Sequence, residues 1–84
     1  MRHIPLGRGA VAFVDEADFP WLTSMGSRRL NGSGYAVHYV TQNGRRRTLY
    51  MHPLILKPTP GVQMQHINRD RLDNWRENLR FTTR

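Results

Sequence analysis

The side chains best suited to chemistry gather in the last third of the chain. His52 and His66 carry imidazoles, and Asn74 and Asn78 follow His66 at close spacing. An imidazole titrates near neutral pH and can take a proton from water. A single histidine is more often an ordinary surface or loop residue, so a catalytic interpretation depends on the residues around it. The sequence contains no cysteine, which excludes disulfides, zinc knuckles and thiol catalysis.

The order of these residues forms a longer pattern. Within residues 51–80, a histidine precedes an aliphatic run and a Pro-Gly turn, and then come a Gln-His-Ile-Asn block, an Asp-Asn pair and Asn-Leu-Arg. This segment resembles the HNH endonucleases, particularly the small phage and homing-endonuclease type. Each short piece is common alone, whereas the joint order and spacing are specific. The upstream half is similar, much less specifically, to the sheet-and-helix DNA-binding domain of plant ethylene-response factors.

The resemblance implies a role for each matching residue. His66 is expected to be the general base that activates a water molecule for attack on the scissile phosphate. Asn78 is expected to pin the loop between two strands through hydrogen bonds to backbone groups. His52 is expected to support the site or contact a phosphate, although core packing at a strand end fits equally well. Asn74, with Asp73, is expected to begin a short helical turn in the loop, where capping explains it.

Two departures from the family pattern bear on the metal. The residue before the catalytic histidine is usually an aspartate that binds a divalent metal, and here it is Gln65, a neutral amide that binds Mg²⁺ poorly. The family's last metal ligand lies on a helix after the second strand, and the printed sequence stops at Arg84, before such a helix. Asp70 and Asp73 are the remaining nearby carboxylates, and their spacing matches no defined ligand set. A divalent metal, Mg²⁺ or Mn²⁺, is therefore expected only if the chain cleaves DNA, and no cofactor otherwise.

These residues must be positioned by a small α+β fold. Alternating apolar residues around a Gly-Arg-Gly turn predict a hairpin with strands at 2–6 and 10–15. A helix is expected from a cap at Asp15 to about Met25, with Pro20 inside it, followed by a polar, glycine-rich loop over 26–34.

A second hairpin, with strands at 35–42 and 45–51, is predicted by Asn43-Gly44, since both turn residues tolerate positive φ. The predicted pairs are Gln42 with Arg45, Val40 with Arg47, His38 with Leu49, Tyr39 with Thr48, and Val37 with Tyr50. Both hairpins are expected to join in one small antiparallel sheet with the helix on one face, followed by the β-hairpin part of a ββα-metal finger. The chain is expected to be a single domain, 1–84, with a DNA-binding part at 1–50 and an HNH-like finger at 51–84.

The charge of the chain points to a polyanionic partner. The formal net charge is +7, and Lys57 is the only lysine among the thirteen basic residues. Arginine offers a planar fork of donors that suits phosphate oxygens and guanine edges, so duplex DNA is the expected partner. A solubilising surface, an anionic membrane and an acidic protein are the alternatives for the same charge. The expected DNA contacts are Arg28, Arg29, Tyr39, Arg45, Arg46, Arg47, Arg69, Arg71, Arg76 and Arg80.

Two functions remain open on this basis. The first is a DNA-binding, HNH-type endonuclease that hydrolyses phosphodiester bonds with His66 as the base. The second is an inactive, HNH-derived DNA-binding or regulatory module, which Gln65 favours; a basic protein-interaction domain is a weaker third. No apolar run approaches the roughly 20 residues of a membrane span, and the amino terminus lacks a signal-peptide core. We expect a protein of the cytoplasm of a bacterial or phage-infected cell, neither secreted nor membrane-bound, and a homodimer would suit a palindromic site.

Overall fold

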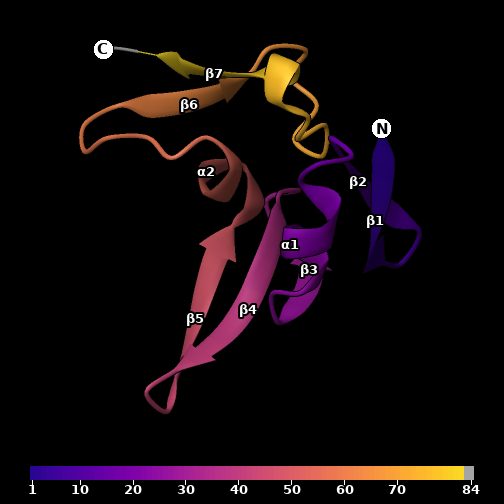
Figure 1. The fold of residues 1–84 in the computed structure, drawn as a ribbon, viewed down its shortest axis with the longest axis vertical. Coiled ribbons are helices and arrows are strands. Elements are labelled where there is room, and N and C mark those ends of the chain that lie inside the picture. Colours follow the sequence, from indigo (N-terminus) through magenta and orange to yellow (C-terminus); the bar gives the residue numbers. More distant parts are fainter. Residues whose placement is uncertain (83–84) are drawn as a thin grey trace.

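The computed structural model describes residues 1–82 and begins with the predicted hairpin. Strands β1 (Arg2–Gly7) and β2 (Ala10–Val14) pair antiparallel, with a register shift between Pro5 and Gly7. Arg8 stands in the turn at φ 54° between two glycines that also have positive φ. Alternate side chains of both strands are buried, as a half-buried hairpin requires. The hairpin forms a sheet of its own at the amino-terminal end of the molecule (Figure 1).

The first helix is shorter than the sequence predicts. Helix α1 spans Phe19–Thr23 only, and Pro20 lies in its first turn, where a missing backbone N–H costs little. Asp15 is not its cap, because the residues after it form a turn in which the Asp15 carbonyl accepts from the N–H groups of Asp18 and Phe19. The prediction failed because Pro20 fixes where a helix can begin, and the acidic residues before it are therefore excluded from the helix.

A three-stranded sheet holds the centre of the chain. Its strands are β3 (Ser27–Leu30), β4 (Ala36–Gln42) and β5 (Arg45–Tyr50), in the order β3-β4-β5. The predicted β4–β5 register is confirmed pair by pair, and both Asn43 and Gly44 have positive φ. The loop predicted over 26–34 is wrong in its first part, since β3 pairs with β4 there. The prediction that the first hairpin joins this sheet is also wrong.

The carboxy-terminal part adds a helix and a third sheet. Helix α2 (Met51–Ile55) follows β5 directly, so His52 lies in its first turn and not at a strand end. Strand β6 (Gln63–His66) pairs antiparallel with β7 (Leu79–Thr82), and the short 3₁₀ helix η1 (Arg76–Asn78) precedes β7. The sequence predicts this last strand over residues 79–83, and residue 83 lies outside the described residues. The expected antiparallel strand pair is present.

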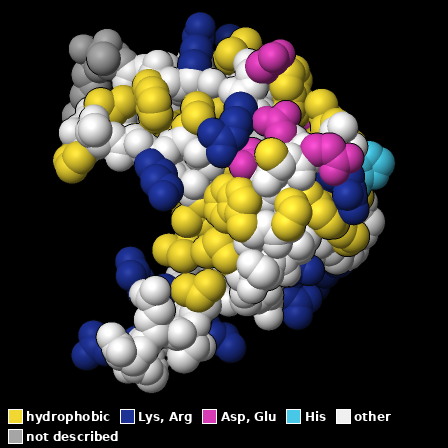
Figure 2. Space-filling model, viewed as in Figure 1, with side chains coloured by type: hydrophobic (Ala, Val, Ile, Leu, Met, Phe, Trp, Pro, Cys, Tyr) yellow, Lys and Arg dark blue, Asp and Glu magenta, His cyan; other side chains and the backbone are white. Residues whose placement is uncertain are grey.

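One hydrophobic core joins these parts in an α+β molecule. Two projections, the β4–β5 hairpin and the β6–β7 hairpin, extend from it on the same side, and the space-filling view shows a hollow between them (Figure 2). None of the helices described in residues 1–82 is long and apolar enough to cross a membrane. The buried members of the core come from every part of the chain: Ile4, Leu6, Ala12, Val14, Leu22, Ala36, Met51, Ile55 and Leu79.

Candidate functional site

A hollow of about 240 Å³ collects both histidines and two of the arginines of residues 51–80, the segment that resembles the HNH endonucleases. His66 ends strand β6 on one side of it, and His52 reaches it from α2. Arg69 and Arg71 come from the loop after β6. Tyr35, just before β4, was not expected at a site, and nothing in its sequence position distinguishes it from a core tyrosine. The full lining is Tyr35, His52, Met64, Gln65, His66, Arg69 and Arg71.

His66 is held by a short hydrogen bond to Asn74. The Nε2 atom of His66 lies 2.7 Å from Oδ1 of Asn74, and the two side chains are 7% and 1% exposed. A carboxamide oxygen only accepts, so this hydrogen bond requires the hydrogen on Nε2 of His66. Asn74 is therefore not the helix cap that the sequence predicts. The η1 turn begins after Trp75 and has no side-chain cap.

His52 lies between two rings and stays neutral. Its ring stacks on Tyr35 with centroids 5.4 Å apart at 25°, and its centroid is 4.9 Å from that of His66. Burial, and then the nearby charge of His66, lower the pKa of His52 to about 4. An uncharged imidazole at neutral pH suits a supporting role better than an ion pair with a phosphate.

Asn78 makes the hydrogen bonds expected of it. Its Oδ1 accepts from the backbone N–H of Asn68 at 3.1 Å, and its Nδ2 donates to the Asp73 carbonyl at 2.8 Å and to the Asn68 side chain at 2.9 Å. Its own carbonyl accepts from the N–H of Ile67. The side chain is 3% exposed, so these bonds close the loop 67–78 from inside.

The same loop is fastened to the first hairpin. The Phe13 N–H of β2 donates to the Leu72 carbonyl at 2.9 Å, and the Asn74 N–H donates to the Phe13 carbonyl at 2.8 Å. Phe13 and Asp73 thus form a parallel bridge. Nothing in the sequence signals this contact, because the partners are far apart in the chain and backbone hydrogen bonds do not depend on side-chain type.

Three arginines expected on DNA are bound to the protein. Arg28 donates to the Thr23 carbonyl at 2.9 Å, and Arg80 donates through Nε and Nη2 to Oε1 of Gln65. Arg76 holds Asp18 with two bonds of 2.9 and 2.8 Å. Asp18 is 2% exposed, and chiefly the hydrogen bonds from Arg76 lower the pKa of its carboxyl. Arg76, which was expected to contact DNA, thus forms an ion pair with Asp18, and its side chain remains 50% exposed.

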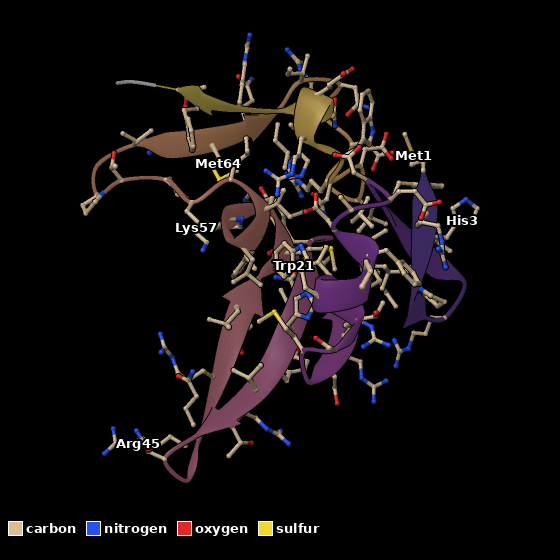
Figure 3. All side chains as sticks on the ribbon, in the orientation of Figure 1. Met1, His3, Trp21, Arg45, Lys57 and Met64 are labelled. Carbon is tan, nitrogen blue, oxygen red and sulfur yellow. The ribbon has the colours of Figure 1, made fainter. Side chains whose placement is uncertain are left out.

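The remaining arginines face solvent. Arg71 donates from Nη1 to the Ser33 carbonyl, and its guanidinium lies 4.9 Å from the centroid of Tyr35, with the other nitrogens left for a ligand. Arg47 bonds the Gln42 side chain at 3.0 Å. Within residues 1–82, no protein hydrogen bond is recorded for the side chains of Arg29, Arg45, Arg46 and Arg69. Dark blue side chains surround the tip of the projecting hairpin in Figure 2, and Figure 3 labels Arg45 there.

The strand register sorts these side chains onto two faces of the central sheet. Cross-strand partners share a face, and successive residues alternate. The pairs Arg29 with Val37, Ser27 with Tyr39, and Thr41 with Arg46 place Arg29, Tyr39 and Arg46 on one face. Arg45 and Arg47 project from the other. Arg29 and Tyr39 also line a larger hollow that includes Arg8 of the first turn, a residue the sequence did not single out.

The residues at the candidate site do not fit a divalent metal. The Gln65 carboxamide oxygen, at the expected ligand position, faces the Arg80 guanidinium and accepts both of its bonds. Asp70 accepts from the Leu72 N–H, and Asp73 accepts from the Asn68 side chain at 2.7 Å. The described residues contain no group of three His, Cys, Asp or Glu side chains able to hold a metal. A hard cation requires several oxygen ligands, which these residues do not bring together.

Comparisons with family models, with curated proteins and with solved structures find no match to this chain. The site must therefore be interpreted from its own chemistry. It offers an imidazole whose ring is fixed on one side, a second neutral imidazole, and two arginines in one hollow. This set can bind an oxyanion and remove a proton from a group beside it.

Proposed function

We propose that this chain binds DNA and presents His66 as a general base to a backbone phosphate, as in the HNH-type endonucleases that its sequence resembles. One observation carries the proposal: a buried His66, held at Nε2, lines the same hollow as Arg69 and Arg71. A histidine with a purely structural role needs no cationic neighbours. A phosphodiester between the two arginines supplies the missing negative charge.

The chemistry assigns each group one task. Arg69 and Arg71 bind the non-bridging oxygens of the phosphate and offset their charge. Water attacks phosphorus, and Nδ1 of His66 takes its proton while the new P–O bond forms. The P–O bond to the leaving sugar oxygen breaks with its electron pair, and that oxygen takes a proton from solvent. His52 remains neutral beside the base, so its imidazole adds no positive charge to the hollow.

The DNA-binding surface in this proposal is the sheet face that carries Tyr39 with Arg29 and Arg46, two arginines whose side chains make no hydrogen bond within residues 1–82. Two adjacent residues at the tip of β5 provide a matched test, since Arg45 and Arg46 are both exposed arginines and their side chains lie on opposite faces of the sheet. The Arg46→Gln variant is expected to weaken binding to duplex DNA and to reduce the salt slope by about 0.9 for one lost phosphate contact. Arg45→Gln is expected to change the slope less. Equal slopes for the two variants would reject this choice of face.

A binding module without cleavage is the second candidate, and one contact favours it. The Gln65 oxygen is engaged by Arg80, so a neutral amide and a guanidinium occupy the region where the family pattern has a metal-binding carboxylate. Such a site retains affinity for phosphate through arginine. It lacks the charge that stabilises a leaving oxygen.

Incubation of supercoiled plasmid with the protein and Mg²⁺ or Mn²⁺ separates the two candidates. If His66 is the base, His66→Ala is expected to slow nicking by about 10²–10⁴-fold while duplex binding persists. If the protein binds duplex DNA but shows no nicking that depends on His66, the result supports the second candidate, a binding module without cleavage. Binding that is indifferent to salt would reject nucleic acid as the partner, because phosphate contacts release counterions.

A further inference from the structure

The Asn74 side chain is an unusual feature of the buried interior. It is 1% exposed, its Oδ1 is hydrogen-bonded to the His66 ring, and its Nδ2 has no hydrogen-bond partner among residues 1–82. A buried N–H group without a partner destabilises a fold, so packing alone would favour an apolar residue of similar size here. The carboxamide is therefore better explained by what its oxygen does to His66 than by stability.

The backbone of Asn74 is fixed from the opposite direction. Its N–H donates to the Phe13 carbonyl of β2, and the preceding residue bridges the same strand. Asn78 holds the carbonyl of Asp73 from within the loop. Asn74 is thus clamped by two independent parts of the fold, and its side chain transfers that fixed position to the imidazole.

We infer that Asn74 is a positioning residue, which holds the His66 ring with its hydrogen on Nε2 and so leaves Nδ1 as the proton-accepting atom. The inference rests on the proposed function, because it names the atom of His66 that accepts the proton from water. It extends to β2, whose Phe13 carbonyl sets the position of Asn74. The amino-terminal hairpin therefore fixes the position of His66 indirectly, through Asn74. It takes no direct part in binding phosphate at this hollow.

A second histidine provides an internal reference of opposite type. His38 is fully buried and its Nδ1 lies 3.2 Å from the Met25 carbonyl. A carbonyl only accepts, so His38 carries its hydrogen on Nδ1. The two buried imidazoles of one molecule are thus expected to be opposite tautomers.

Nitrogen-15 NMR of the free protein above pH 7.5 tests the inference directly. The two-bond couplings between ring nitrogens and ring protons are expected to give the Nε2–H pattern for His66 and the Nδ1–H pattern for His38 in one spectrum. An Nδ1–H pattern for His66 would overturn the inference, since the carboxamide would then present its NH₂ group. DNA is absent from this measurement, so its outcome is independent of whether the protein cleaves.

Two substitutions separate positioning from packing. Asn74→Asp keeps an acceptor oxygen, so the protected Nε2 proton of His66 is expected to persist in the proton spectrum. Asn74→Leu fills the same space without an acceptor, and this proton is expected to exchange with solvent and disappear. Persistence of the proton in a folded Leu variant would overturn the inference. If a variant fails to fold, the wild-type tautomer decides alone.

Nicking assays then connect the tautomer to activity. Asn74→Asp is expected to retain nicking, and Asn74→Leu is expected to lose part of what His66→Ala loses, in kcat more than in KM. Unchanged kcat in a folded Leu variant would overturn the positioning role. A correct tautomer in a protein that never nicks DNA would instead refute the proposed cleavage and leave the geometric inference standing.

Discussion

The ion pair between Asp18 and Arg76 gives the sharpest test of how the two halves of the chain are joined. Asp18, before α1, accepts one bond from the Trp21 indole and two from the Arg76 guanidinium in η1. Its side chain is 2% exposed, whereas that of Arg76 is 50% exposed. The Arg76→Met variant keeps the aliphatic stem and leaves the Asp18 carboxylate buried with only the indole as a side-chain donor.

The expected loss of stability follows from that asymmetry. Removing one partner of a fully buried pair costs about 3–5 kcal/mol, because the other charge remains uncompensated. Water reaches the half-exposed guanidinium and can partly replace it, so we reduce this to about 1.5–3 kcal/mol, the range for hydrogen bonds to charged groups. For a domain of this size, such a loss lowers the Tm by roughly 6–24 °C.

The matched control is the Arg2–Glu16 pair, in which both side chains are exposed, at 46% and 70%. Glu16→Gln is expected to change the free energy of unfolding by less than about 0.5 kcal/mol in urea titrations. The hydrogen bonds from Arg76 hold the pKa of Asp18 below its ordinary range, so their contribution is present at neutral pH and is lost as the pH falls through that lowered pKa. The difference between wild type and Arg76→Met should therefore shrink below about pH 4. A difference that is absent at pH 7, or constant down to pH 2, would refute the reasoning.

Three further predictions concern stability. Gly26→Ala places a Cβ 2.2 Å from a β4 carbonyl oxygen at φ 42°, and should cost about 2 kcal/mol or more in urea titrations, whereas Gly32→Ala meets nothing within 4 Å and should cost less than 1. Burial lowers the pKa of both His38 and His52, so the folded state binds fewer protons and stability should decline as the pH falls from 7.5 to 5; a flat profile would contradict this. Asn78→Ala removes three side-chain hydrogen bonds and should cost about 1.5–4.5 kcal/mol, with faster exchange of loop amides; unchanged exchange would count against its role as a pin.

Local turn chemistry explains what the sequence predicts well. Asn43-Gly44 allows positive φ at both central positions, which fixes a two-residue loop and with it every pair of β4 and β5. Strand β3 was missed because Ser27–Leu30 shows neither apolar alternation nor strong β formers. It is a strand because β4 offers its backbone as a partner, which is a tertiary effect that overrides local preference.

The candidate site shows the same division between local and distant information. The motif order located His66 and Asn78, because the loop between them is a local unit whose closure depends on a few polar residues. Asn74 looked like a cap because Asp-Asn pairs commonly cap helices, whereas its true partner is a ring across the loop. Arg76 was predicted to contact phosphate because the sequence does not reveal its buried partner. Asp18 lies 58 residues away in the chain and is brought beside Arg76 only by the fold.

The contacts between the two parts of the chain also set how they can act together on DNA. The core runs from Ile4 to Leu79, the Phe13 backbone holds the loop that carries Asn74, and Asp18 holds Arg76. Under the proposed function, the phosphates at the sheet face and at the His66 hollow are therefore separated by a distance that packing sets, not by a flexible linker. Rigid spacing between two weak phosphate sites gives affinity only to a duplex whose shape matches both. Loosening the contact between Asp18 and Arg76 should therefore first disturb the spacing of the two phosphate sites. The affinity of each site alone should fall only afterwards.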